Sequence, residues 1–177
     1  RCVRPGTGDN MAAPVGHRGQ TQGGLGIIVA RRERIDMREQ RVRGLIVDFV
    51  GVLDGPEEDQ RRWRELFAAA KANGVSTAIL SNDPGGPGAE HIREWEYKGI
   101  VDAVVLSGEV GAEKPEAEAF AAAAAAIDLP MNDCVHVDDS ILNVRGAVEA
   151  GLVGVLYQVF DRAVIEICSI FDIEGEF

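Results

Sequence analysis

The sequence lacks any apolar run approaching the roughly 20 residues that a helix needs to cross a bilayer, so we expect no membrane segment and no membrane partner. It also lacks the pattern of a secretory leader at its N-terminus. Its three cysteines have no metal-ligand spacing and do not make an even set for disulfides. Together these absences favour a cytoplasmic protein with reduced thiols.

Basic residues are scarce outside the first quarter of the chain. Residues 1–43 carry nine arginines and four acidic residues, a net charge of +5, whereas the remaining 134 residues carry nine basic and 25 acidic residues, a net charge of −16. A nucleic-acid surface needs clustered Lys and Arg, so the acidic part argues against a nucleic-acid partner. The excess of carboxylates is compatible with a divalent-cation site.

Short apolar runs alternate with helix-like patterns from residue 44 onward. Runs bounded by turn residues are typical of strands buried on both faces, and we expect strands at 44–50, 75–80, 103–107, 134–137 and 153–157. We expect helices at 57–73, around Ile92 and Trp95, from Pro115 onward, between Asp138 and Gly151, and near 161–171. Pro115 would occupy the first turn of the third helix. Val144, Ala147 and Val148 would share one face of the fourth.

Five alternations of strand and helix predict an α/β fold, in which helices cover both faces of a parallel sheet of about five strands. We therefore predict one three-layer Rossmann-like domain over residues 44–177, since 177 residues do not comfortably hold two domains. Residues 1–36 are rich in Gly, Arg and polar residues. We expect residues 1–43 to form an arm without regular structure.

Ligands of open parallel sheets bind outside the carboxyl ends of the strands. Six residues whose side chains could take part in catalysis or binding are expected there: Asp48, Ser81, Asn82, Lys114, Asp138 and Asp139. Clustered carboxylates disfavour full ionisation unless a cation joins them, and Mg²⁺ prefers such hard oxygen ligands. A carboxylate can then act as a nucleophile, with Lys and Ser stabilising the charge of the transferred group.

The order of these residues resembles the four motifs of the haloacid dehalogenase-like (HAD) superfamily. The stretches EVGAEKPEAEAF and VHVDDSILNVRGAVEAG are similar to motifs three and four of its subfamily I, and the resemblance covers about residues 44–160. It implies a HAD-like fold, with Asp48 as nucleophile and Lys114 as the lysine of motif three. Ser81, with Asn82, would contact the substrate. Asp138, with Asp139 beside it, would hold Mg²⁺, and Asn143 would stabilise the loop there.

One position departs from the family pattern. HAD phosphatases usually carry a second aspartate two residues after the nucleophile, as general acid and base, and this chain has Val50. Valine cannot transfer a proton, and general acid–base help is typically worth about 10²- to 10⁴-fold in rate. The backbone carbonyl of Val50 can still serve as a Mg²⁺ ligand.

The spacing of the motifs leaves no room for a cap domain. Only 33 residues separate Asp48 from Ser81, and another 33 separate Ser81 from Lys114. Both gaps are filled by the strands and helices already predicted. We therefore expect an open site that suits a bulky phosphorylated small molecule or a protein substrate, or that a second subunit covers in a homo-oligomer.

Simpler interpretations stand beside these. Asp48, Ser81 and Asn82 could be turn residues, Asp138 and Asp139 could cap a helix, and Lys114 could be a solvated loop lysine. Asp54 is interpreted as a turn residue, and His136 as a core histidine. The leading hypothesis is a Mg²⁺-dependent phosphatase-type hydrolase with an aspartyl intermediate at Asp48. The alternative is a catalytically degenerate HAD-like domain that binds a phospho-ligand or a partner protein. A response-regulator receiver is excluded, because receivers place their acidic pair at the first strand.

Overall fold

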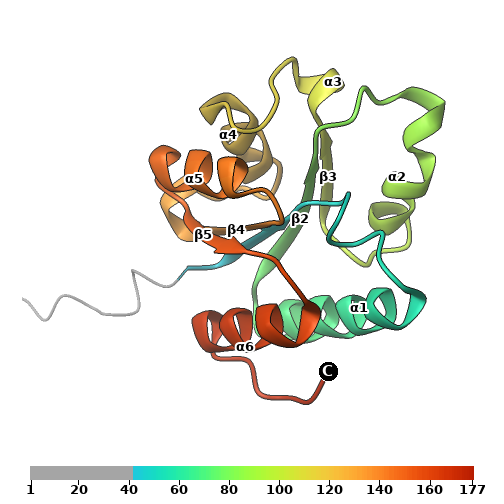
Figure 1. Cartoon of the computed structure of the whole chain (residues 1–177), viewed down its shortest axis with the longest axis vertical. Helices are drawn as coiled ribbons and strands as arrows, with labels where there is room; N and C mark the ends of the chain where they lie inside the picture. Colours follow the sequence, from blue (N-terminus) through green and yellow to red (C-terminus); the bar gives the residue numbers. More distant parts are fainter. Residues whose placement is uncertain (1–41) are drawn as a thin grey trace, which may run out of the picture. The chain divides into compact units, whose positions relative to one another are not determined.

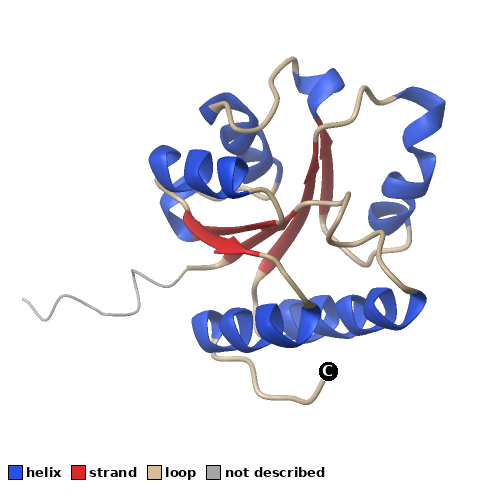
Figure 2. Cartoon of the chain, in the orientation of Figure 1, coloured by secondary structure: helices blue, strands red, loops and turns tan. Residues whose placement is uncertain are grey.

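The five apolar runs form the five strands of one parallel sheet in a computed structural model that describes residues 42–177 (Figure 2). The strands are β1 (Gly44–Val47), β2 (Ser76–Ser81), β3 (Ala103–Leu106), β4 (Cys134–Asp138) and β5 (Val153–Leu156). The predicted α/β class and strand number are therefore confirmed. β1 is shorter than predicted, because the N–H groups of Val52, Leu53 and Asp54 turn back to donate to the carbonyl of Phe49.

The strand order β3-β2-β1-β4-β5 places β1 in the centre of the sheet. Val47 at the end of β1 is in register with Ile79 of β2 and with Val137 of β4. The carboxyl ends of these three strands therefore lie at one edge of the sheet, and the residues just after Val47, Ile79 and Val137 are neighbours there.

Helices cover both faces of the sheet (Figure 1). The α-helices are α1 (Glu57–Ala72), α2 (Glu90–Tyr97), α3 (Ser107–Val110), α4 (Ala117–Ala126), α5 (Ile141–Ala150) and α6 (Phe160–Phe171). Two short 3₁₀ turns, η1 (Gly86–Ala89) and η2 (Met131–Asp133), precede α2 and β4.

Alternation along the strands divides the core in two. Leu45 and Val47 of β1 point to the face that is covered by α1, α2 and α6, where Trp63, Phe67 and Phe160 are buried. Ile46 points to the opposite face, where it belongs to the cluster formed by buried residues of α4 and α5. The sheet is thus the middle of three layers, as predicted.

Two predictions about helices are wrong. Pro115 does not lie in the first turn of its helix, because α4 begins at Ala117 and the Lys114–Pro115 peptide bond is cis. The backbone of Lys114, the residue before Pro115, exchanges two hydrogen bonds with the side chain of the distant Asn82. Val148 does not share the buried face of α5 with Val144 and Ala147, because its side chain is exposed.

The predicted arm over residues 1–43 lies outside the described residues except for its last two positions. Of these, Arg43 belongs with the sheet: its N–H donates to the carbonyl of Asp133, and its own carbonyl accepts from Ser76. Within residues 42–177, no helix has the length and apolar character needed to cross a membrane.

Candidate active site

The predicted site residues come to the carboxyl edge of the sheet from three neighbouring strands. Asp48 directly follows β1, Ser81 is the last residue of β2, and Asp138 is the last residue of β4. Lys114 reaches the same edge from the loop between α3 and α4. Topology, not sequence distance, therefore brings together residues that are up to 90 positions apart.

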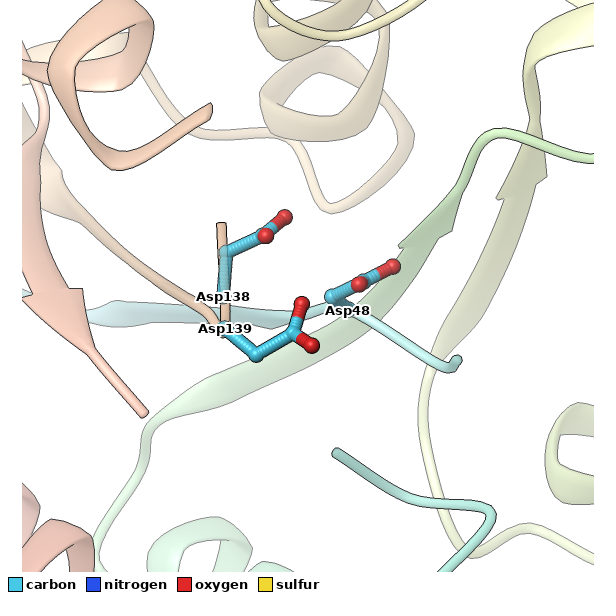
Figure 3. A group of neighbouring side chains, drawn as sticks. All are labelled: Asp48, Asp138 and Asp139. Carbon is cyan, nitrogen blue, oxygen red and sulfur yellow. The ribbon is translucent and has the colours of Figure 1, made fainter. Parts of the chain in front are cut away.

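Three carboxylates form the centre of this site (Figure 3). One ligand atom from each of Asp48, Asp138 and Asp139 lies within 4.8 Å of the others. Asp48 and Asp138 are buried, and Asp139 is exposed. Gly51 packs against Asp139: it has a positive φ of 83°, and a Cβ at this position would lie 2.3 Å from Oδ2 of Asp139. A side chain at residue 51 would therefore disturb both the turn and the carboxylate.

Lys114 connects two of the carboxylates. Its Nζ lies 2.6 Å from Oδ1 of Asp48 and 2.7 Å from Oδ2 of Asp138, and its side chain is only 1% exposed. The alternative of a solvated loop lysine is thus wrong. A buried ammonium needs such partners, because an unpaired charge in the interior is strongly destabilising.

Asp138 receives several hydrogen bonds besides that of Lys114. The N–H of Ser140 donates to Oδ1 at 2.8 Å, and Nδ2 of Asn143 lies 3.1 Å from both oxygens. Nε2 of His136 lies 3.1 Å from Oδ2. Burial acts to raise the pKa of Asp138, but the hydrogen bond from His136 and the charge of Lys114 outweigh it and hold this pKa well below its usual range.

The pKa of Asp48 is shifted in the opposite direction. Burial raises the pKa of Asp48 from its ordinary value of 3.8 to about 6. The charge of Lys114 opposes this rise, and the charge of Asp138 adds to it. The two hydrogen bonds that Asp48 accepts from described residues, from Lys114 and from the N–H of Phe49 at 2.8 Å, both end on Oδ1. Oδ2 accepts neither of these two hydrogen bonds.

The donor set fits a divalent cation. Three carboxylates and one ammonium leave a formal charge of −2. Mg²⁺ binds such hard carboxylate oxygens and keeps further positions for phosphate and water. The acidic group therefore fits the ion that the sequence predicted.

Asn82, which is predicted to contact the substrate, contacts the backbone of Lys114 with its side chain. Its Nδ2 donates to the carbonyl of Lys114 at 2.9 Å, and its Oδ1 accepts from the N–H of Lys114 at 2.8 Å. Both polar groups of the side chain are thus engaged by one residue. The contact favours a positioning role, in which Asn82 fixes the loop that carries the ammonium of Lys114.

We expect Asn82→Ala to lower kcat/KM for a phosphate ester about 10-fold, with a stability loss of about 1–2 kcal/mol from two lost hydrogen bonds. Steady-state kinetics and thermal unfolding measure the two effects. Asn73→Ala is the matched control, since it removes another side-chain amide that donates to a backbone carbonyl, that of Asp172. An Asn82→Ala enzyme as active as the parent would contradict this role.

Asp54 belongs to the turn that follows Asp48, as predicted. Its Oδ1 accepts the N–H of Gly51 at 2.6 Å, which closes the turn. Val50, in the same turn, has an exposed side chain. The structure therefore places an apolar, solvent-facing residue at the position where the family pattern has its second aspartate.

The sequence does not predict the contact between His136 and Asp138. His136 was predicted to be a core histidine and is fully buried, yet its ring reaches Asp138. The signal was present in the strand period: residues two apart point to the same face of a strand, so His136 and Asp138 share one side of β4.

A three-layer α/β domain that gathers Asp48, Lys114 and Asp138 at its strand ends has the architecture expected of the HAD superfamily. The family model for haloacid dehalogenase-like hydrolases matches residues 28–151, and the chain belongs to this family.

Two individual proteins are similar to this chain. A sesquiterpene phosphatase of Aspergillus oryzae is 30% identical over 94 residues, which are 52% of this chain and 47% of that protein. The chain thus spans about half the length of the curated relative that it matches. A crystal structure of an uncharacterized protein from Corynebacterium glutamicum is 74% identical, with a TM-score of 0.76 over 77% of this chain and 99% of that one.

A more distant structure shows the same fold. A HAD-superfamily hydrolase from Ehrlichia chaffeensis has 18% identity and a TM-score of 0.57 over 74% of this chain and 98% of that chain. The predicted HAD-like fold is therefore confirmed.

Proposed function

We propose that this domain is a Mg²⁺-dependent phosphatase that forms an aspartyl-phosphate at Asp48. The observation that carries the proposal is the buried Lys114 ammonium, which lies within 2.7 Å of both Asp48 and Asp138 in a cluster of three carboxylates. A nucleophile, a positive charge for the transferred group and a set of cation ligands thus occupy one edge of the sheet.

In the first step, Oδ2 of Asp48 forms a bond to phosphorus while the bond between phosphorus and the alcohol oxygen breaks. The alcohol oxygen keeps the electron pair of that bond and takes a proton from water, because Val50 has none to give. Oδ1 of Asp48 stays bound to Lys114 and to the Phe49 N–H, which orients the carboxylate. The Lys114 ammonium and the Ser81 hydroxyl stabilise the charge on the phosphoryl oxygens.

In the second step, water forms a bond to phosphorus and the bond to Asp48 breaks, which releases inorganic phosphate and restores the carboxylate. The proton of the attacking water passes to solvent. Proton transfer is unassisted in both steps, so we expect slow turnover.

Asp48, Asp138 and Asp139, with the backbone carbonyl of Val50, would hold the Mg²⁺ ion. When bound, the ion supplies positive charge that orients the phosphate and lowers repulsion between it and the carboxylates. Asn143 and the Ser140 N–H keep Asp138 oriented for this purpose.

The substrate would be a phosphate ester with apolar surface outside the phosphate. Between Asp48 and Lys114 the chain forms only the helices and strands of the main domain, so we propose a site without a cap. Val50, which comes soon after β1, and Ile141 and Leu142, which come soon after β4, have exposed apolar side chains. The matched relative from Aspergillus oryzae, by its name, acts on a phosphorylated sesquiterpene.

Val50 favours a second candidate, a degenerate HAD-like domain that binds a phospho-ligand or a partner protein without hydrolysis. The two functions share the same ligand-binding groups and differ only in turnover.

The test is hydrolysis of an aryl phosphate by the wild-type protein. We expect turnover with Mg²⁺, its loss in EDTA and its return when Mg²⁺ is restored. Because only ionised Asp48 attacks, the rate should rise with pH and level off at or below about pH 6, since a bound cation favours the ionised form. A protein that is silent with Mg²⁺ at every pH contradicts the phosphatase and supports the second candidate.

A further inference from the structure

His136 lies behind the candidate metal site, on the buried side of Asp138. Its ring is fully buried in β4 and packs edge-to-face against Phe120 of α4, with ring centroids 5.1 Å apart. Nε2 lies 3.1 Å from Oδ2 of Asp138, the same oxygen that Lys114 contacts. The proposed reaction does not use this ring, so its contact with a cation ligand needs another explanation.

The position of the ring proton follows from the two nitrogens. With the proton on Nε2, the ring donates to a carboxylate oxygen, which is a strong charge-assisted hydrogen bond. The other tautomer would place the lone pair of Nε2 against the carboxylate, which is repulsive, and would put the proton on Nδ1. Nδ1 makes no hydrogen bond with any part of the chain that the structure describes. A buried unpaired N–H is costly, so the Nε2–H tautomer is favoured.

We infer that His136 is a positioning residue that donates from Nε2 to Oδ2 of Asp138 and thereby orients this carboxylate for the divalent cation. The inference rests on the proposed function of the site. The hydrogen-bond donors to the Asp138 carboxylate come from two sides. Ser140 and Asn143 donate from the loop and helix that follow β4, and His136 contacts it from within the sheet. A carboxylate fixed on two sides cannot rotate away from the ion.

Variants of His136 test this role through cation binding. Mn²⁺, titrated into the protein and followed by electron paramagnetic resonance, is the probe, and no turnover is needed. We expect His136→Leu to weaken Mn²⁺ binding at least about 10-fold, as loss of a group that orients a metal ligand does. His136→Gln keeps an N–H donor of similar reach and should recover most of the affinity.

Thr77→Val is the matched control, because Thr77 is another fully buried side chain of the sheet and the substitution removes its hydrogen bond to Asp102. It should lower thermal stability and leave Mn²⁺ affinity within about 2-fold of the wild type, as expected for sites without shared partners. Equal Mn²⁺ affinity in wild type and His136→Leu would overturn the inference while leaving the proposed metal site intact. A wild type that binds no Mn²⁺ would overturn both.

A measurement without substitution keeps the inference testable if His136→Leu does not fold. The chain has only three histidines, so long-range ¹H–¹⁵N spectra of the wild type can resolve the His136 ring. We expect a proton on Nε2. A ring protonated on Nδ1 alone would overturn the inference.

Discussion

Asp48→Asn is expected to reduce hydrolysis of an aryl phosphate at least about 10³-fold, because it removes the only group proposed to form the covalent intermediate. The amide is the same size as the carboxylate, and its oxygen can still accept hydrogen bonds from Lys114 and from the N–H of Phe49. The loss would therefore report on chemistry. The measurement is the steady-state rate at saturating Mg²⁺, with phosphate release as the readout.

Loss of folding does not explain such a result, because the pKa of Asp48 predicts a stable variant. Its folded pKa of about 6 lies above the ordinary 3.8, so the native state holds a proton more tightly than the unfolded chain. Without a cation, the stability that this provides is present below pH 4 and is lost as pH rises to 6, by up to about 3 kcal/mol. Asn resembles the protonated form and avoids that loss, so Asp48→Asn in EDTA should unfold at a temperature no lower than the wild type at pH 7.

Asp54→Asn is the matched control for charge removal in the same turn. Asp54 accepts the N–H of Gly51 and closes the turn, and the amide oxygen of Asn can do the same. We expect activity within about 2-fold of the wild type, as for most substitutions that keep the local hydrogen bond. Full activity in Asp48→Asn, or equal losses in both variants, would contradict the assignment of Asp48 as nucleophile.

Val50→Asp is expected to raise kcat about 10²- to 10⁴-fold, the usual worth of general acid–base help. The Val50 side chain is 60% exposed, so the desolvation cost of a carboxylate at this position is small. It stands two residues after Asp48, where the HAD pattern has its proton donor. The comparison is with the wild type under the same Mg²⁺ and pH.

Val50→Asn separates proton transfer from polarity at this position. It has the size of Asp and no proton of suitable acidity, so it should leave kcat near the wild-type value. A gain in both variants would point to altered substrate contact. No gain in Val50→Asp, with a wild type that is already active, would show that protonation of the leaving alcohol is not limiting.

Much of the fold follows from local patterns. Apolar runs such as 134–137 are too short for helices and too apolar for exposed strands, which predicts a sheet covered on both faces. The strand order could not be read from the runs, because it depends on how crossovers pack over a distance. Pro115 shows the same limit: local chemistry favoured a helix start there, but α4 begins at Ala117, and the residue before Pro115 is hydrogen-bonded to Asn82, 32 residues earlier in the chain.

The candidate site, too, could be predicted only in part from the sequence. Asp48, Lys114 and Asp138 meet as expected, because residues after neighbouring parallel strands must share an edge of the sheet. The contacts of Asn82 and His136 depend on the directions of their side chains, which the residue types do not specify. Both turned out to hold other site residues, Asn82 through the backbone of Lys114 and His136 through the carboxylate of Asp138.

The central place of β1 has a consequence for synthesis of the protein. β1 is made first, but its neighbour β4, which ends with Asp138, lies about 90 residues further along the chain. A chain still on the ribosome therefore contains Asp48 before Lys114 and Asp138 have been made, and the group of three carboxylates is complete only after β4 has emerged. A cation held by Asp48, Asp138 and Asp139, as we propose, would therefore stabilise the finished domain and not its early assembly.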